Sequence, residues 1–220
     1  MFAEKLVTKQ RLEKTLATIG PIGLILLLFS LFYTLAYLAS PHLPGQNLEH
    51  PVGWWGWSDQ SLYFKSATAF SRFNLNGSEH TYPFFYPLLV APFVRPFGTH
   101  AFFAVDIACF LIAAGGFLII GSRLIGLFAS AVLFSAILCF PWEIGEAWII
   151  PWTSTPSAAL ITILLLICSN ERFVQGNNRL FYYLLYGMLA SLLVLIRPLD
   201  FASAALTYVY IGVRTLYSAH

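Results

Sequence analysis

Charged residues are scarce in this sequence. Only 10% of its 220 residues are Asp, Glu, Lys or Arg, where soluble domains have roughly 25%. The formal net charge is +2 and the basic residues are scattered, so the chain offers no basic surface for nucleic acid. The apolar fraction is 58%, against roughly 45–50% in soluble domains, and the mean hydropathy is +0.73. The composition therefore predicts a polytopic membrane protein.

Cysteine and glycine-rich motifs are also scarce. Cys109, Cys139 and Cys168 each lie within an apolar run and show no metal-ligand spacing, so we expect all three to pack in the core. No Walker or Rossmann fingerprint occurs, which means that no recognisable glycine loop is present to hold the phosphates of a nucleotide. These absences give no support to a nucleotide site or a cysteine metal site.

Long apolar runs dominate what is present. The first, at 18–38, follows a basic tail at 1–17 and is about 21 residues long, whereas the apolar region of a signal peptide is roughly 7–15. We therefore expect a retained first helix. Together with the later runs it predicts an all-α integral membrane protein of about six transmembrane helices, with 1–220 as a single transmembrane domain. The later candidate spans are 100–121, 124–140, 155–169, 181–196 and 201–213.

The distribution of basic residues predicts the orientation. If the tail at 1–17 is cytoplasmic, six spans place eight Lys and Arg residues inside and four outside, as the positive-inside tendency expects. The long loop at 40–99 and a second loop at 141–154 then face outward, and the helical bundle covers 100–216. These loops hold every tryptophan, either as an aromatic belt or as a surface for sugar rings and lipid headgroups. The tryptophans are Trp54, Trp55, Trp57, Trp142, Trp148 and Trp152.

The long outer loop contains the stretch GWWGWSDQSLYFKSA. Ser58 can cap a helix whose first turn contains Asp59, and apolar residues continue at helical spacing as far as Phe73. We expect this helix to lie along the bilayer surface, where Asp59 either stabilises the helix start or acts chemically. Further on, prolines interrupt the apolar run at 80–98, which predicts a surface or membrane-dipping segment.

In this arrangement the sequence resembles the GT-C superfamily of polytopic glycosyltransferases, which includes protein O-mannosyltransferases and the aminoarabinose transferase of lipid A. The N-terminal module of that superfamily has one helix and a long outer loop, which carries an acid, a tyrosine and a proline segment. Here only Pro87 follows Tyr86, so the usual proline pair is incomplete. Members are usually longer, so the resemblance covers their N-terminal module. The matching motifs are SDQSLY, FFYPLLVAPF, IIGSRLIG, PWEIGEAW and VLIRPLDF.

The resemblance implies transfer of a sugar from a polyprenyl-phosphate donor to a lipid, glycan or protein acceptor. The expected location is the periplasmic or extracellular face of a bacterial inner membrane, with the endoplasmic reticulum membrane as the alternative. Asp59 would be the base that takes the acceptor's proton. Arg197 would meet the negative charge that grows on the leaving phosphate, unless it only snorkels or pairs with Asp200. Contacts to substrate would come from Tyr63, Tyr86 and Trp57.

Glu143 and Glu146 lie three residues apart in the second outer loop, so both carboxylates could face Asp59 from one helical turn. They could bind the acceptor, hold a divalent cation such as Mg²⁺ or Mn²⁺ with Asp59, or remain solvated. Apart from that metal, no cofactor is expected. The expected partners are the donor, the acceptor and membrane lipids, without nucleic acid.

Asp106 supports a rival function, because it is a carboxylate inside a predicted span. Intramembrane acids are costly and usually functional or paired, so a transporter or channel subunit could use Asp106 on its permeation path. Against this, no second ionisable residue lies deep in another predicted span, and the sequence shows no inverted repeat. A non-catalytic membrane scaffold is the third class.

Overall fold

The structure is a computed structural model that describes residues 2–80, 82–140, 142–169, 179–200, 202–203, 205–209 and 213. The regular elements within those residues are all helical, with no strand among them. The predicted all-α fold class is therefore confirmed. The bundle consists of α1 Phe2–Ala39, α4 Ala101–Leu124, α5 Leu127–Cys139, α7 Ser154–Cys168 and α9 Arg179–Ile196.

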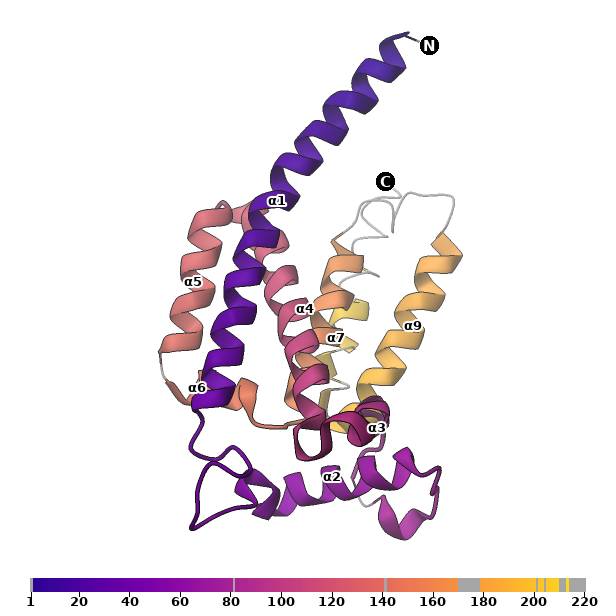
Figure 1. Ribbon diagram of the computed structural model, residues 1–220. Helices are drawn as coiled ribbons and strands as arrows, with labels where there is room; N and C mark the ends of the chain where they lie inside the picture. The colour runs from indigo at the N-terminus through magenta and orange to yellow at the C-terminus, as the bar shows by residue number, and fades with distance from the viewer. Residues whose placement is uncertain are drawn as a thin grey trace.

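Successive helices of the bundle run in alternating directions (Figure 1). α1 runs toward the bottom of the view, α4 returns upward, α5 descends, α7 ascends and α9 descends again. Both predicted outer loops, 40–99 and 141–154, consequently lie at one end of the bundle, which we call the loop end. The N-terminus lies at the opposite end.

Two segments of the described chain are long and apolar enough to cross a membrane. They are Gly20–Ala39, within α1, and Phe85–Leu124, which includes α3 (Phe85–Phe97) and α4. The helices α5, α7 and α9 are apolar, but their apolar stretches are shorter than a full span. Of the sixth predicted span, 201–213, the structure describes residues 202–203, 205–209 and 213, and these are helical. Six transmembrane helices therefore remain a prediction.

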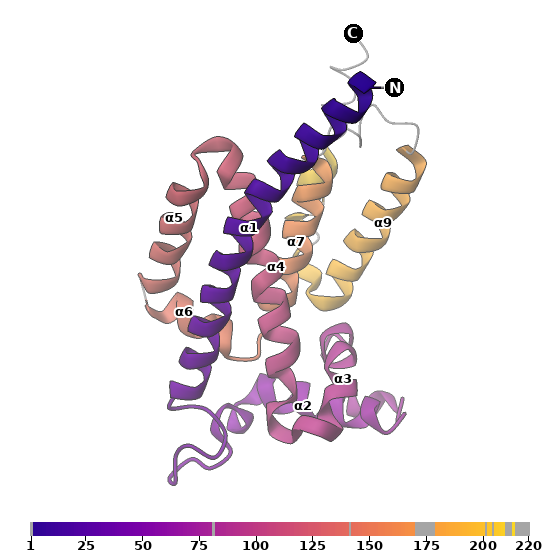
Figure 2. The ribbon, with the colours of Figure 1, turned by 45° about the horizontal axis from the view of Figure 1, so that its top comes forward.

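Short helices cover the loop end (Figures 1 and 2). α2 (Ser58–Ser71) lies across this end, and α3 packs against both α2 and α4. The proline-rich run thus forms a helix despite Pro92 and Pro96, while Pro87 occupies its first turn, where a missing N–H costs little. The other short elements are η1 Gly53–Gly56, η2 Gly77–Glu79, η3 Gly98–His100, α6 Trp142–Ile149 and η4 Pro198–Asp200.

The predicted cap of α2 was wrong by one residue. Trp57 holds the extended N-cap conformation, and Ser58 is already helical. The reason is local: η1 ends at Gly56, and the Trp57 N–H donates to the Trp54 carbonyl at 3.0 Å, which leaves Trp57 as the extended residue between two helical turns. The helix also ends before Phe73, whose φ of +56° and 90% exposed side chain place it outside the buried stripe.

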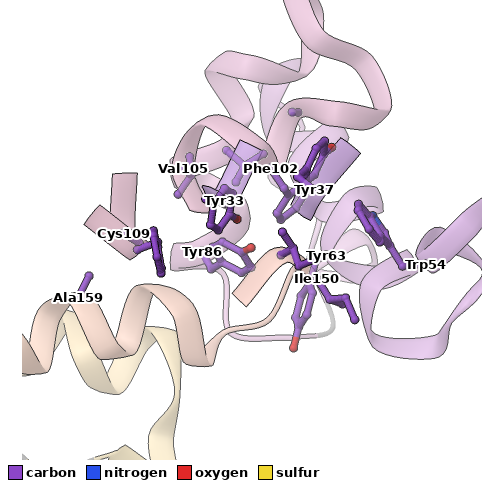
Figure 3. Packing of buried hydrophobic residues seen from close by; sticks show 14 of the residues in the cluster. Tyr33, Tyr37, Trp54, Tyr63, Tyr86, Phe102, Val105, Cys109, Ile150 and Ala159 are labelled. Carbon is purple, nitrogen blue, oxygen red and sulfur yellow. The ribbon is translucent and has the colours of Figure 1, made fainter. Parts of the chain in front are cut away.

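Aromatic side chains from α1, α4 and the loop-end elements form the core (Figure 3). Tyr37 lies 4.6 Å from Phe103 and 5.6 Å from Trp54 between ring centroids, so α1 is packed against both α4 and η1. Cys109 and Cys168 are buried as predicted. Cys139 is exposed, so its predicted core position was wrong: α5 buries Ser130, Phe134 and Leu138, and the next residue along a helix points about 100° away.

Candidate functional site

A cavity of about 310 Å³ at the loop end brings together segments that are distant in the sequence. The start of α2 contributes Asp59 and Tyr63, and the connection before α3 contributes Tyr82. The loop before α7 adds residues 152–154, and the end of α9 adds residues 196–199, which include Arg197. We call this hollow the Asp59 cavity. Three of the predicted site residues, Asp59, Tyr63 and Arg197, therefore share one cavity.

Asp59 lies in the first turn of α2, where the positive end of the helix dipole favours a carboxylate. Its side chain is half-buried, and the Tyr82 hydroxyl donates a hydrogen bond of 2.6 Å to Oδ1. This hydrogen bond raises the pKa of Tyr82, because the phenol must keep its proton to donate it. Among the described residues no hydrogen bond engages Oδ2, so this oxygen can still accept one.

Tyr63 lines the same cavity as Asp59 and Arg197, and both charges act on its phenol. Burial raises the pKa of its phenol, a hydrogen bond with Thr153 lowers it, the Asp59 charge raises it and the Arg197 charge lowers it. Its ring meets those of Tyr82 and Tyr86 edge-on, at 5.3 and 5.8 Å between centroids. Tyr63 is thus a protonated, closely packed side chain of the cavity lining. Its hydrogen bond with Thr153 joins α2 to the loop before α7.

Arg197 follows α9 directly, and its backbone N–H donates to the Leu193 carbonyl at 2.9 Å as the last helical bond. Its side chain is exposed at the cavity. No ion pair joins Arg197 to Asp200 among the described residues, although both belong to the same turn. The alternative in which Asp200 neutralises Arg197 is therefore wrong, and the guanidinium remains available for an anion.

Two other predicted site residues lie at a second loop-end cavity or beside it. Trp57 lines this cavity of about 410 Å³ together with His42 and His50. The Trp57 and His42 rings are 5.2 Å apart, and Glu146 Oε1 lies 3.8 Å from His42 Nε2. Glu146 therefore approaches His42 rather than Asp59.

The described side chains provide no set of ligands for the expected divalent metal. No three His, Cys, Asp or Glu residues among them are grouped so that they could hold a metal ion. The side chain of Glu143, the other predicted partner, lies outside the described residues, although its backbone belongs to α6. The described part of the chain thus leaves Asp59 without a second carboxylate in its cavity.

Tyr86 does not reach the Asp59 cavity. It is fully buried, and its hydroxyl donates a hydrogen bond of 2.6 Å to Asp106 Oδ1. Asp106 is itself 1% exposed, so the pair joins α3 to α4 inside the core. The structure therefore places Tyr86 in the core and away from the Asp59 cavity, and the acid of the predicted span, Asp106, is paired.

Two of the three loop tryptophans near Asp59 are also core residues. Trp54 is 0% exposed and Trp55 is 9% exposed, whereas Trp57 is 37% exposed. The Trp55 indole stacks on Phe64 at 4.9 Å and donates from Nε1 to the Thr99 carbonyl at 2.9 Å. Trp54 and Trp55 thus anchor the loop by burial, and Trp57 alone of these three retains a face for a ligand.

Sequence reasoning missed Tyr82, which donates the only side-chain hydrogen bond to Asp59 among the described residues. A signal was present, because the segment contains two Tyr-Pro pairs four residues apart, Tyr82-Pro83 and Tyr86-Pro87. The resemblance pointed to the second pair, but the structure places the first pair in the cavity and the second in the core. Thr153 was also missed, because nothing local marks it as a partner of Tyr63.

Comparisons with known proteins add no identification. Neither a protein-family model, nor a curated protein, nor a solved structure matches this chain. The residues of the Asp59 cavity and their geometry are therefore the basis for a functional proposal.

Proposed function

We propose that this chain is a membrane glycosyltransferase that moves a sugar from a polyprenyl-phosphate donor to a lipid, glycan or protein acceptor. One observation carries the proposal: Asp59 and Arg197, from opposite halves of the sequence, line the same loop-end cavity. A carboxylate supplies a base, and a guanidinium that forms no ion pair with any described residue supplies an anion site in the same cavity. Their roles match those implied by the resemblance to the GT-C superfamily.

The proposed reaction is a displacement at the anomeric carbon of the donor sugar. The acceptor hydroxyl oxygen forms a bond to that carbon while the bond from the carbon to the phosphate oxygen breaks. The hydroxyl proton passes to Asp59 Oδ2, and the bonding electrons leave with the lipid phosphate. Arg197 stabilises the negative charge that accumulates on the phosphate, and Tyr82 holds the carboxylate in position through Oδ1.

The surface of α1 supports placement in a bilayer. Six of its leucines are each more than half exposed, which would be costly in water and is favourable in lipid. They are Leu24, Leu27, Leu28, Leu31, Leu35 and Leu38. We propose that α5, α7, α9 and 201–213 complete a set of six spans with α1 and α4. At about 1.5 Å per residue, the 13 residues of α5 cover about 20 Å, so flanking apolar residues and local thinning must span the rest.

The proposed orientation rests on where the basic residues lie. Four of them are at the loop end: Lys65, Arg72, Arg95 and Arg197. Arg123 lies in the last turn of α4, at the same end of the bundle as the N-terminus. We propose that the loop end faces the periplasm or the extracellular space and that the opposite end is cytoplasmic. The Asp59 cavity then lies at the outer boundary of a bacterial inner membrane.

The first test measures sugar transfer from a radiolabelled polyprenyl-phosphate sugar pool by purified protein in lipid vesicles. We expect Asp59→Asn to lower the rate by about 10²–10⁴-fold, because the amide cannot accept the proton. Glu79→Gln is the matched control, because it also removes a carboxylate from the segment 40–99. The Glu79 carboxylate pairs with Lys65 at 3.1 Å and does not line the Asp59 cavity.

Equal transfer by the Asp59→Asn and parent proteins would reject Asp59 as the base. Absence of transfer by the folded parent protein across a broad donor and acceptor panel would reject the enzyme proposal for this chain. Ion or solute flux that disappears on Asp106→Asn replacement would instead favour the transporter alternative.

A further inference from the structure

The second loop-end cavity, of about 410 Å³, takes no part in the proposed transfer chemistry. It lies in the connection between α1 and α2 (Figure 1), and none of its lining residues lines the Asp59 cavity. Its volume falls within the roughly 300–1,000 Å³ of ordinary small-molecule sites. We call it the His42 cavity. Its lining includes His42, Asn47, His50, Gly53, Gly56 and Trp57.

Backbone hydrogen bonds fix the walls of the His42 cavity to each other. The Trp54 N–H donates to the His42 carbonyl and the Gly45 N–H donates to the Pro51 carbonyl, both at 2.9 Å. The two halves of the connection are thereby joined on either side of the cavity. Gly53 permits the close approach, since a Cβ there would overlap the His42 carbonyl oxygen. The walls are therefore preorganised, which lowers the entropic cost of binding a ligand.

Polar groups of two side chains in this cavity are available to a ligand. Asn47 is half-buried, and within the described residues only its Oδ1 is engaged, where it accepts the Glu49 N–H at 2.9 Å. Its amide N–H groups therefore remain as donors. The His50 imidazole forms no hydrogen bond within the part of the chain that the structure describes. When neutral, this ring offers one donor and one acceptor.

Trp57 gives the same cavity an apolar side. Its indole is 37% exposed, and its ring lies 5.2 Å from that of His42 between centroids. An aromatic face carries partial negative charge, so it packs favourably against the C–H groups of a ligand. The cavity thus combines an aromatic surface with amide and imidazole groups that form hydrogen bonds.

The charges near the His42 cavity favour an uncharged ligand. Neither Lys nor Arg is among the described residues that line it, and the Glu146 carboxylate lies 3.8 Å from His42 Nε2. An anion such as phosphate would therefore meet a negative charge without a fixed cation to bind it. A hydrocarbon would exclude water from Asn47 and His50 without replacing its hydrogen bonds, which is costly. A sugar ring avoids both costs, because it has an apolar C–H face and hydroxyl groups.

We propose that the His42 cavity binds an uncharged mono- or disaccharide. The C–H face of a sugar ring packs on Trp57, and its hydroxyl groups form hydrogen bonds with Asn47 and His50. Assignment of this saccharide to the acceptor rests on the proposed function, and the acceptor is then a glycan or a glycolipid. Saccharide binding itself can be measured without any sugar transfer.

The test uses saturation-transfer difference NMR with the full-length protein in phosphatidylcholine nanodiscs. The probes are methyl glycosides of glucose, galactose, mannose and N-acetylglucosamine, together with maltose, lactose and chitobiose. We expect saturation of the ring C–H protons of at least one probe. Trp57→Ala should reduce this signal at least five-fold. Phe73→Ala is the matched control, because it removes an aromatic ring that is 90% exposed and lines neither cavity.

A second variant tests the hydrogen bonds separately from the aromatic contact. His50→Ala removes an exposed side chain and should weaken the affinity by roughly two- to ten-fold, the usual effect of losing one hydrogen bond. Gln46→Ala is its control, because Gln46 is also exposed in this connection but does not line the cavity. His50→Ala decides the question even where Trp57→Ala does not fold.

Three results would overturn the saccharide site. The first is a folded parent protein that saturates none of the probes. The second is an equal signal from the parent, Trp57→Ala and His50→Ala proteins. The third is displacement of the bound glycoside by inorganic phosphate at the same concentration, which would indicate an anion site instead.

The two proposals fail in different ways. Trp57-dependent saccharide binding by a folded parent protein without any sugar transfer would reject the enzyme and keep the saccharide site. Sugar transfer without Trp57-dependent saccharide binding would keep the enzyme and reject the saccharide site.

Discussion

At the scale of single residues, the environment of Asp59 differs from that of Asp106. Each carboxylate accepts a 2.6 Å hydrogen bond from a tyrosine hydroxyl, but Asp59 is half-buried at a cavity and Asp106 is 1% exposed in the core. The same residue types therefore lie in different environments. In the proposed function, the tyrosine beside the open carboxylate positions a reactive group, whereas the tyrosine beside the enclosed one satisfies a polar group inside the protein.

The Tyr82→Phe variant tests the positioning role. Removing the hydroxyl frees the Asp59 carboxylate to rotate, and hydrogen bonds to charged groups contribute about 1.5–3 kcal/mol, so we expect transfer to slow by roughly ten- to a hundred-fold. Steady-state kinetics in vesicles would measure the change. Tyr208→Phe is the control, because this 64% exposed tyrosine lies away from the cavity. An unchanged rate for Tyr82→Phe would show that Asp59 needs no such support.

The Tyr86–Asp106 pair makes a different prediction, which concerns stability. Tyr86→Phe leaves a buried carboxyl without its donor and should lower the free energy of unfolding by about 1–3 kcal/mol. Adding Asp106→Leu removes the unsatisfied group, so the double variant should recover part of that loss. Thermal unfolding in detergent would measure both. If the double variant is no more stable than Tyr86→Phe, the hydrogen bond is not the main contribution of this pair.

At the scale of elements, the loop before α2 is held by backbone contacts that the sequence does not display. Gly53 has a φ of +53°, and a Cβ there would overlap the carbonyl of His42. The Trp54 N–H donates to that same carbonyl at 2.9 Å. Gly53 therefore allows the chain to turn tightly enough for Trp54 to enter the core and for α2 to begin where it does.

Replacement of this glycine should consequently be costly. We expect Gly53→Ala to lower the melting temperature and to reduce transfer, because the added methyl group must displace the backbone at 42–44. Gly45→Ala is a close control: Gly45 also has a positive φ, of +83°, but a Cβ there would meet nothing within 4 Å. Equal melting temperatures for the two variants would mean that backbone conformation alone, not crowding, sets the cost.

The elements also show what could be predicted from the sequence. Apolar runs of helical length indicated α4, α5, α7 and α9 with small errors at their ends, because burial or lipid exposure favours the same residues along the whole run. The end of α1 was also predicted closely, but the helix begins at Phe2, within the stretch that was predicted as a basic tail. The proline run at 80–98 was harder. α3 packs against α2 and α4, and this packing stabilises a helix in a stretch where proline disfavours one. A prediction from local preference alone therefore did not expect a regular helix there.

At the scale of the whole molecule, the sequence indicated candidate residues but not which of them would meet. Asp59, Tyr63 and Arg197 converge because the helices alternate in direction and return the end of α9 to the loop end. The other predicted residues lie elsewhere. Trp57 and Glu146 both lie near His42, and Tyr86 is hydrogen-bonded to Asp106. Such pairings depend on helix rotation and tilt, which hydrophobic periodicity constrains only loosely.

The division of the Asp59 cavity between early and late segments has a consequence for biosynthesis. Asp59 and Tyr63 are synthesised soon after α1, but Arg197 follows only when α9 has been made. During most of translation the ribosome-bound chain therefore lacks the wall of the cavity that contains Arg197. The order of synthesis thus delays assembly of the cavity until nearly all of the described helices have been made.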